Sequence, residues 1–183
     1  TSFAGLWGGP YLMHVYGVSK GRAGGILSLV AVGMIIGSPL AGYLSTRVLQ
    51  GRKPALVLAS LVVVAITAAL AFATENMSLS LIGLLCFGLG IFASAIAVVG
   101  FTSARELFPA RIAGTSFGLL NLFPFAGGAV LQPLLGAILE KHGKVGSAFT
   151  IAGYREAFFV LFLSALAAFI ASLFVQETLE KHR

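Results

Sequence analysis

Long stretches without a charged residue dominate the sequence. Five of them contain at least 20 residues each, at positions 23–46, 54–74, 76–104, 112–139 and 157–176. A helix rises about 1.5 Å per residue and the hydrocarbon core of a bilayer is about 30 Å thick, so about 20 residues are needed to cross it. None of the stretches shows the alternating polarity, over about 10 residues, of a membrane β-strand. The pattern therefore predicts five membrane-spanning helices.

The first 18 residues are also uncharged, but Gly8, Gly9 and Pro10 interrupt them and the segment is short for a complete crossing. Its large apolar side chains suit lipid, so we interpret it as the outer part of a sixth helix that begins upstream of residue 1. The alternative is an interfacial or re-entrant stub. The predicted all-α membrane bundle thus contains six helices: 1–18, 23–46, 54–74, 77–104, 112–139 and 156–176.

Composition supports the membrane class. Apolar residues make up 58% of the 183 residues and charged residues only 10%, whereas an average soluble domain has about 25% charged residues. A soluble fold of this size cannot cover so much apolar surface, so the soluble globular and disordered classes are excluded. Cys86 is the lone cysteine, and with three scattered histidines it does not suit a metal site. We therefore expect neither a metal nor another cofactor.

The net charge of +6 arises from short basic clusters between the long uncharged runs. This arrangement is typical of loops at a lipid surface, and no nucleic-acid partner is expected because such a partner needs a continuous basic stripe. Because crossings alternate sides, loops 47–53 and 105–111 share one side with the C-terminal tail. That side carries seven basic residues against five on the other: Arg47, Arg52, Lys53, Arg105, Arg111, Lys181 and Arg183. The positive-inside rule then places the C-terminus in the cytoplasm, and we expect a bacterial inner (plasma) membrane.

Glycine is frequent inside the predicted helices, although in water it costs a helix about 1 kcal/mol relative to alanine. In lipid, glycine allows two helix backbones to approach closely. We therefore expect helix contacts at the glycines that recur at short intervals: Gly33, Gly37, Gly42, Gly83, Gly88, Gly90, Gly114 and Gly118. Prolines at positions 10, 39, 124 and 133 lie within the same helices and permit kinks.

Two connections resemble signature loops of the major facilitator superfamily. The loop after helix 23–46 has the order glycine, hydroxyl residue, basic residue, glycine and two basic residues: Gly42, Thr46, Arg47, Gly51, Arg52 and Lys53. The connection after helix 77–104 is similar to the family's link between the tenth and eleventh helices: Arg105, Glu106, Pro109, Arg111, Gly114 and Gly118. The interrupted segment at Gly8–Pro10 fits the broken seventh helix. The resemblance covers the whole chain and implies helices seven to twelve, the C-terminal half of a twelve-helix fold.

The first of these loops departs from the family pattern at two points. Thr46 stands where the family has an acid, and two extra residues separate Arg47 from Gly51. A carboxylate at that position pairs with arginines or with the positive end of a helix, whereas a threonine hydroxyl can cap but carries no charge. We therefore expect a weaker cytoplasmic latch in this half. Alternatively, Arg47, Arg52 and Lys53 only set the topology.

The resemblance also implies a solute site near the membrane midplane, between two six-helix halves that rock about it. In the first predicted helix, Trp7, Tyr11 and His14 share one helical face. In the fifth, Asn121 and Gln132 are 11 residues apart, close to three turns, and an unpaired amide at membrane depth is costly. We predict that these five residues line the solute pathway. The alternatives are an interfacial aromatic belt for Trp7 and Tyr11, simple solvation for His14, and interhelical bonds for the two amides.

No complete stretch contains Asp, Glu, Lys or Arg, so these helices offer no buried ionisable group for coupling to a proton or ion. The coupling groups then lie in the other half, or transport is uncoupled, or aromatic and amide contacts bind the solute. An enzyme is not expected, because dispersed Ser, Thr, Asn and Gln do not assemble a catalytic set.

The sequence thus predicts secondary active or facilitated transport of a small solute by alternating access. The expected partners are the bilayer, the solute and the N-terminal six-helix half of the same transporter. The alternative is a non-transporting six-helix bundle that acts as a structural or dimerising module, and an isolated fragment could form a homodimer.

Overall fold

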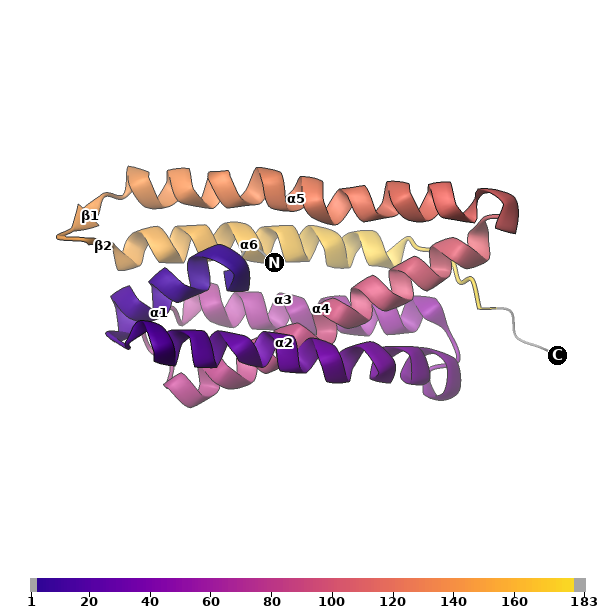
Figure 1. The fold of residues 1–183 in the computed structure, drawn as a ribbon, viewed down its shortest axis with the longest axis horizontal. Coiled ribbons are helices and arrows are strands. Elements are labelled where there is room, and N and C mark those ends of the chain that lie inside the picture. The colour runs from indigo at the N-terminus through magenta and orange to yellow at the C-terminus, as the bar shows by residue number, and fades with distance from the viewer. Residues whose placement is uncertain (1–2, 180–183) are drawn as a thin grey trace.

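The computed structural model describes residues 3–179, and within them six α-helices are joined by short connections and one β-hairpin (Figure 1). The helices are α1 Gly8–Tyr16, α2 Lys20–Tyr43, α3 Arg52–Phe72, α4 Leu79–Leu107, α5 Ala113–Lys141 and α6 Ile151–Leu173. The hairpin strands are β1 Lys144–Val145 and β2 Ala148–Phe149, antiparallel to each other. Five of the helices, all except α1, are long and apolar enough to cross a membrane. The predicted six-helix all-α bundle is confirmed.

Several helix ends differ from the bounds that the uncharged runs predict. α2 begins at residue 20 instead of 23, and α6 begins at residue 151 instead of 156. Hydroxyl caps explain both starts, since Ser19 accepts a hydrogen bond from the N–H of Arg22 at 3.4 Å and Thr150 accepts one from Gly153 at 3.2 Å. Charged residues therefore lie within the first two turns of these helices, Lys20 and Arg22 in α2 and Arg155 and Glu156 in α6.

The first helix differs as well. A π-helical turn at Phe3–Trp7 precedes α1, which ends before Gly17 in a left-handed conformation with φ of 64°. A second π-helical turn, Leu44–Val48, follows α2. Both turns replace parts of the single helices that the sequence pattern predicts at 1–18 and 23–46.

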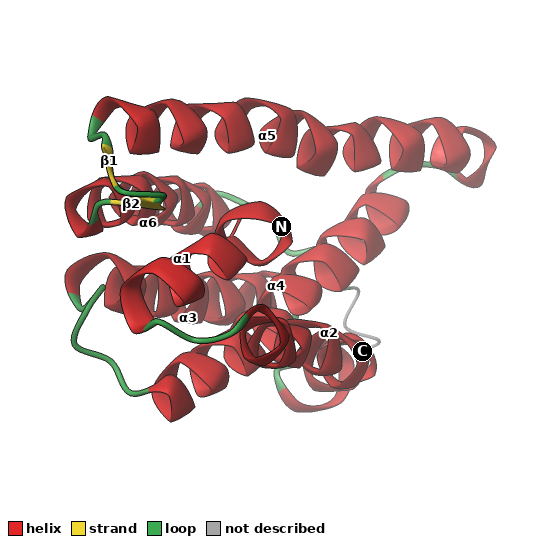
Figure 2. Cartoon of the chain, turned by 60° about the vertical axis from the view of Figure 1, so that its left-hand side comes forward, coloured by secondary structure: helices red, strands yellow, loops and turns green. Residues whose placement is uncertain are grey.

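The long helices form a layered bundle that the two views show from different sides (Figures 1 and 2). The most extensive contact joins α2 to α4, and the next joins α3 to α6. α3 also packs against α4, so it lies inside the bundle. α5 lies at the edge beside α6 and makes much smaller contacts with α6 and α4. One helix is therefore held less firmly than the other four.

Glycines allow the close contact between α2 and α4. A Cβ atom on Gly33 would lie only 2.2 Å from the carbonyl oxygen of Phe87, and one on Gly90 would lie 2.1 Å from that of Val30. Gly37 is equally restricted, with Ile91 Cα at 2.6 Å. The expectation of helix contact is therefore correct at these glycines, because their backbones touch the neighbouring helix directly.

Other glycines in the same expected set face open space. A Cβ atom on Gly42, Gly114 or Gly118 would meet nothing within 4 Å among the residues that the structure describes. The regular spacing of these glycines therefore does not produce a helix contact within residues 3–179, and the expectation is wrong for them in this part of the fold.

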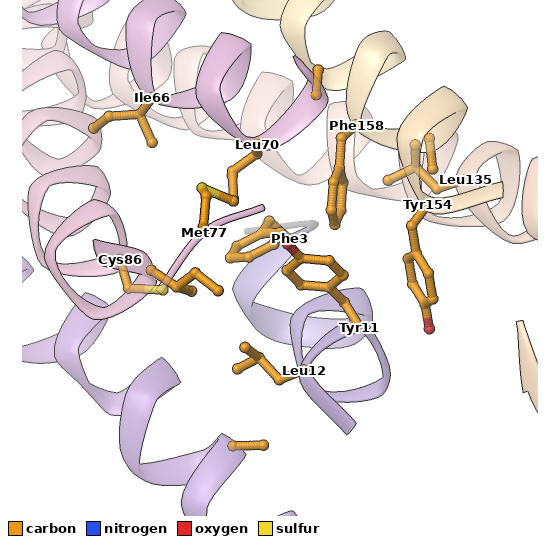
Figure 3. Close-up of a cluster of buried hydrophobic side chains, with 14 of the residues drawn as sticks. Phe3, Tyr11, Leu12, Ile66, Leu70, Met77, Cys86, Leu135, Tyr154 and Phe158 are labelled. Carbon is orange, nitrogen blue, oxygen red and sulfur yellow. The ribbon is translucent and has the colours of Figure 1, made fainter. Parts of the chain in front are cut away.

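The largest cluster of buried side chains surrounds Tyr11 (Figure 3). Its ring packs edge-on against Phe158 at 4.8 Å between centroids and also contacts Tyr154 and Phe3. Its hydroxyl donates to the carbonyl oxygen of Thr74 in the α3–α4 connection. The buried tyrosine thus joins α1 to α3 and α6, with its polar end satisfied.

Replacing Gly33 by alanine tests the backbone contact. We expect Gly33→Ala to lower the free energy of unfolding by about 1–3 kcal/mol, because the new methyl group must push α2 away from α4. Gly25→Ala is the matched control on the same helix, since its Cβ meets nothing within 4 Å and alanine favours helix by about 1 kcal/mol. Thermal unfolding in detergent measures both. Equal effects of the two substitutions would contradict the contact.

Candidate functional site

The residues that resemble signature loops gather at one end of the bundle. At this end the α2–α3 loop, the α4–α5 connection and the segment after α6 meet, whereas the β-hairpin marks the opposite end (Figure 1). We call the first the Arg52 end and the second the hairpin end. Arg52 lies in the first turn of α3, and its side chain is only 9% exposed.

The guanidinium of Arg52 is surrounded by acceptors from two other segments. Its Nη2 donates to Glu106 Oε1 at 2.8 Å, and its Nε reaches both carboxylate oxygens at 3.2 and 3.3 Å. Its Nη1 donates to the hydroxyl oxygens of Ser45 at 2.8 Å and Thr46 at 2.9 Å. Glu106 in turn accepts a bond from the Thr178 hydroxyl at 2.6 Å. A nearly buried charge is thereby paired, and all three of its nitrogens donate hydrogen bonds.

A second acid, Glu177 after α6, caps the N-terminus of α3. Glu177 accepts hydrogen bonds from the main-chain N–H groups of Arg52 at 2.7 Å and Lys53 at 3.1 Å, the unpaired donors of the first helical turn. Burial raises the pKa of the Glu177 carboxyl, but main-chain N–H donors from Leu179, Arg52, Lys53 and Thr178 lower it, and the net direction is down. The carboxylate is therefore held in its charged form at the helix end.

Gly51 leaves the room that this acid needs. A Cβ atom at this position would lie 2.6 Å from Glu177 Oε2 and 2.8 Å from Pro54 Cγ. Two glutamates, one at the end of α4 and one after α6, thus supply the charge that the signature pattern has at residue 46. Arg52 is ion-paired with Glu106 and Thr46 adds a hydrogen bond, while the weaker latch expected from Thr46 stays a prediction.

The extra residues between Arg47 and Gly51 are accommodated by unusual backbone. The N–H of Leu49 bonds to the carbonyl of Leu44 across the π-helical turn, and Gln50 adopts a positive φ of 47°. A π-helical turn holds one more residue than an α-helical turn and is frequent at functional sites. It also directs both Ser45 and Thr46 toward Arg52.

The remaining predicted loop residues lie outside this cluster. Arg47, Arg105 and Arg111 are exposed, and within residues 3–179 their side chains make no hydrogen bond or ion pair. Lys53 contributes only its main-chain N–H. Gly42 and Gly114 face open space, as described above. Lys181 and Arg183, counted in the charge argument, lie outside the described residues.

The two predicted amides line one cavity. A cavity of about 500 Å³ between α4 and α5 is bordered by Asn121, Gln132 and the rings of Phe101 and Phe125. Pro124 and Gly128 lie on the same wall, where the missing side chain of Gly128 leaves space. Within residues 3–179 neither amide side chain makes a hydrogen bond. Both are therefore able to bind a group outside this part of the chain.

A second cavity, of about 450 Å³, continues along α5 toward the hairpin end. Trp7, Gln132 and Glu140 line it together with small residues of α5. The indole N–H of Trp7 donates to the main-chain carbonyl of Gln132 at 3.2 Å. A Cβ atom on Gly136 would lie only 3.0 Å from the indole ring. Trp7 is thus brought to the same helix as the two amides.

The other two candidates of the first helix lie elsewhere. Tyr11 is completely buried in the core and borders neither cavity. His14 Nδ1 accepts a hydrogen bond from the N–H of Phe149 at 3.3 Å, so the Tyr154 hydroxyl at 2.8 Å is its second donor. Their predicted contact with a solute remains a prediction.

A third cavity, about 590 Å³ at the Arg52 end, is apolar. Leu107, Phe108 and Phe123 border it, and the hydroxyls of Ser103 and Ser116 that face this region donate to carbonyls of their own helices. It therefore offers few groups that could orient a polar solute. Within the described residues no group of three potential metal ligands occurs either.

Sequence reasoning missed Ser45, Glu177, Thr178 and Tyr154. Glu177 and Thr178 follow the last apolar stretch, and their partners Arg52 and Glu106 are 125 and 72 residues away in the sequence. No local pattern announces such a contact. The family pattern did offer a signal. It has an acid at the position of Thr46, and the absence of that acid here suggests looking for a carboxylate from another segment near Arg52.

Glu106→Gln tests the ion pair. We expect the free energy of unfolding to fall by about 1.5–3 kcal/mol, because the charge of Arg52 stays nearly buried with a neutral acceptor. Glu75→Gln is the matched control, since Glu75 forms an exposed pair with Arg155 at 3.0 Å, whose loss costs at most about 1 kcal/mol. Thermal unfolding of the two variants in detergent measures the difference, and a larger loss for Glu75→Gln would refute the assignment.

Acidification tests the cap on α3. Because the folded-state pKa of Glu177 lies below the unfolded value of about 4.3, its stabilising effect is complete above that value and is lost as the pH falls through the folded pKa. Wild-type protein should therefore melt at a higher temperature than Glu177→Gln at pH 7, and the gap should shrink below pH 4. A gap that stays constant over this range would show that the carboxylate charge has no role.

The sequence profile of the Major Facilitator Superfamily matches residues 1–183. Over 168 residues the chain is 29% identical to a probable galactarate/D-glucarate transporter of Escherichia coli, a match that covers 88% of this chain and 36% of that protein. It is also 29% identical over 168 residues to a major facilitator superfamily multidrug transporter of Candida albicans, covering 91% of this chain and 25% of that protein.

The chain thus spans about a third or less of the length of these two relatives. The match along the whole chain, the all-helical bundle and the five apolar helices agree with one another. The protein is an integral membrane protein, and it belongs to the Major Facilitator Superfamily.

Proposed function

We propose that this chain is the C-terminal half of a transporter that moves a small solute across the membrane by alternating access. The observation that carries the proposal is the cavity between α4 and α5, where Asn121 and Gln132 make no hydrogen bond within residues 3–179. An amide at membrane depth requires a partner, and a passing solute supplies one. No bond of the solute changes, so the protein acts as a carrier and not as an enzyme.

The uneven packing of the bundle supports the rocking motion. Backbone contact at the glycines ties α2 to α4, the bonds of Arg52 tie α3 to α4, and an extensive contact ties α6 to α3, which suits a unit that moves as one body. α5 is packed lightly and exposes apolar side chains such as Leu119, Leu122 and Phe125. We assign this surface to the N-terminal half of the same transporter and to lipid.

Orientation is part of the same proposal. The Arg52 end carries exposed arginines at positions 47, 105 and 111, while both nearby glutamates are used in bonds to Arg52, Lys53 and Thr178. A surplus of exposed basic residues favours the cytoplasmic side. The Arg52 end and the C-terminus then lie in the cytoplasm, and the hairpin end faces the opposite side.

The names of the relatives limit the substrate only broadly. One is called a probable transporter of sugar diacids and the other a multidrug transporter, at the same identity of 29%. Both names describe carriers of small organic molecules, which is the class that we propose for this protein.

Uptake by the full-length protein in proteoliposomes tests the proposal. Asn121→Leu should lower kcat/KM for the transported solute about 3- to 10-fold, which corresponds to one lost hydrogen bond of about 0.5–1.5 kcal/mol. Val130→Ala is the matched control on the same helix, because Val130 is 66% exposed and borders neither α5 cavity.

The comparison separates three results. Reduced uptake for Asn121→Leu, with wild-type uptake for Val130→Ala and equal expression of both, is the expected outcome. Unchanged uptake for Asn121→Leu would remove the amide from the pathway. If proteoliposomes with wild-type protein carry no metabolite across the membrane, the chain belongs to a structural or dimerising bundle.

A further inference from the structure

Gln132 is the polar side chain of α5 that borders both cavities; the small Ala129 borders both as well. Gln132 lines the cavity that contains Asn121 and also the cavity that contains Trp7 and Glu140. Its main-chain carbonyl is bonded to the Trp7 indole, whereas within the described residues its amide side chain makes no hydrogen bond. Gln132 is therefore half-buried at the junction of the two spaces.

The residues around this junction form a stripe along one face of α5. Residues 121, 125, 128, 132, 136 and 140 follow one another at intervals of three or four, so they share a helical face. Asn121 and Gln132 are about 16 Å apart along the helix axis, at about 1.5 Å per residue. Gly128 and Gly136 leave space between the polar positions. A solute can therefore meet the amides one after the other along α5.

The side chains of this stripe are uncharged over its membrane depth. An amide side chain both donates and accepts hydrogen bonds, so it matches groups that do the same, above all hydroxyl groups. The rings of Phe101, Phe125 and Trp7 provide apolar surfaces beside these amides. The first charged residue on the stripe is Glu140, at the hairpin end, and its carboxylate repels anions.

We propose that this half binds an uncharged, hydroxyl-bearing solute, a polyol being the simplest, and that Gln132 is the residue which the solute contacts in both cavities. The inference rests on the proposed transport function and adds the solute class to it. A carboxylate on the solute would find no cation among the residues that line either cavity, and would lie near Glu140 at one mouth.

A matched series of six-carbon compounds tests the solute class. A hexitol, the corresponding aldonate and the corresponding aldarate share a carbon chain and differ by zero, one and two negative charges. A bound compound raises the melting temperature of the full-length protein in detergent by mass action. We expect the hexitol to stabilise the protein and the aldarate to have the smallest effect. Greater stabilisation by either acid than by the hexitol overturns the proposed class. So does the absence of stabilisation by all three compounds.

Gln132→Leu tests the residue. It should weaken the binding of the hexitol about 3- to 10-fold, the effect of one lost hydrogen bond. Gln176→Leu is the control, because it makes the same chemical change at an exposed position that borders neither cavity. Wild-type hexitol binding by Gln132→Leu overturns the role of Gln132.

Counterflow of the hexitol in proteoliposomes separates this inference from the proposed function. Stabilisation by the hexitol without counterflow would support the solute class and contradict transport. Counterflow of an acid without any binding of the hexitol would support transport and contradict the solute class.

Discussion

The guanidinium of Arg52 is a charge that the fold removes almost completely from solvent, and the Arg52 end depends on how it is paired. A charge in such surroundings is tolerated only with close opposite charge and with its N–H groups bonded. Glu106 supplies the charge from the end of α4, and Ser45 and Thr46 supply hydroxyls from the π-helical turn. Because the partners come from separate segments, one side chain fixes how α3, α4 and the α2–α3 loop meet.

Close backbone packing complements this polar contact along the length of the bundle. In lipid there is little hydrophobic force between helices, so contact depends on shape and on a few polar bonds. Gly33 and Gly90 bring α2 and α4 together where any side chain would collide. Within the described residues α5 has no such glycine backbone contact, it is bonded to the Trp7 indole through the carbonyl of Gln132, and most of its side chains are exposed. The cavities lined by Asn121 and Gln132 lie beside this lightly held helix.

The helices could be predicted from the sequence because each crossing needs about 20 uncharged residues, and such runs are visible without knowledge of their neighbours. The starts of α2 and α6 were harder to predict, because the uncharged-run criterion stops at charged residues. Lys20 and Arg22 follow the cap at Ser19, and Arg155 and Glu156 follow the cap at Thr150. Asn121 and Gln132 could be singled out in the sequence because an unpaired amide is costly at membrane depth, and their role in a solute pathway stays a prediction. Glu177 was not found, because only the folded chain brings it to the N-terminus of α3, 125 residues away in the sequence. Tyr11 shows a different limit of the sequence. Its helical face suggested a solute pathway, whereas its neighbours in the folded chain bury it in the core.

Alternating access is the central claim, and it concerns which side of the membrane reaches the cavity at Asn121. The most direct measurement is labelling of Asn121→Cys in the full-length protein with a membrane-impermeant thiol reagent, added from either side of sealed vesicles. Cys86 is buried and gives a low background, which the unmodified protein measures. The account predicts that position 121 is labelled from both sides and that bound solute slows both reactions. Labelling from one side only, with no effect of any transported solute, would contradict it.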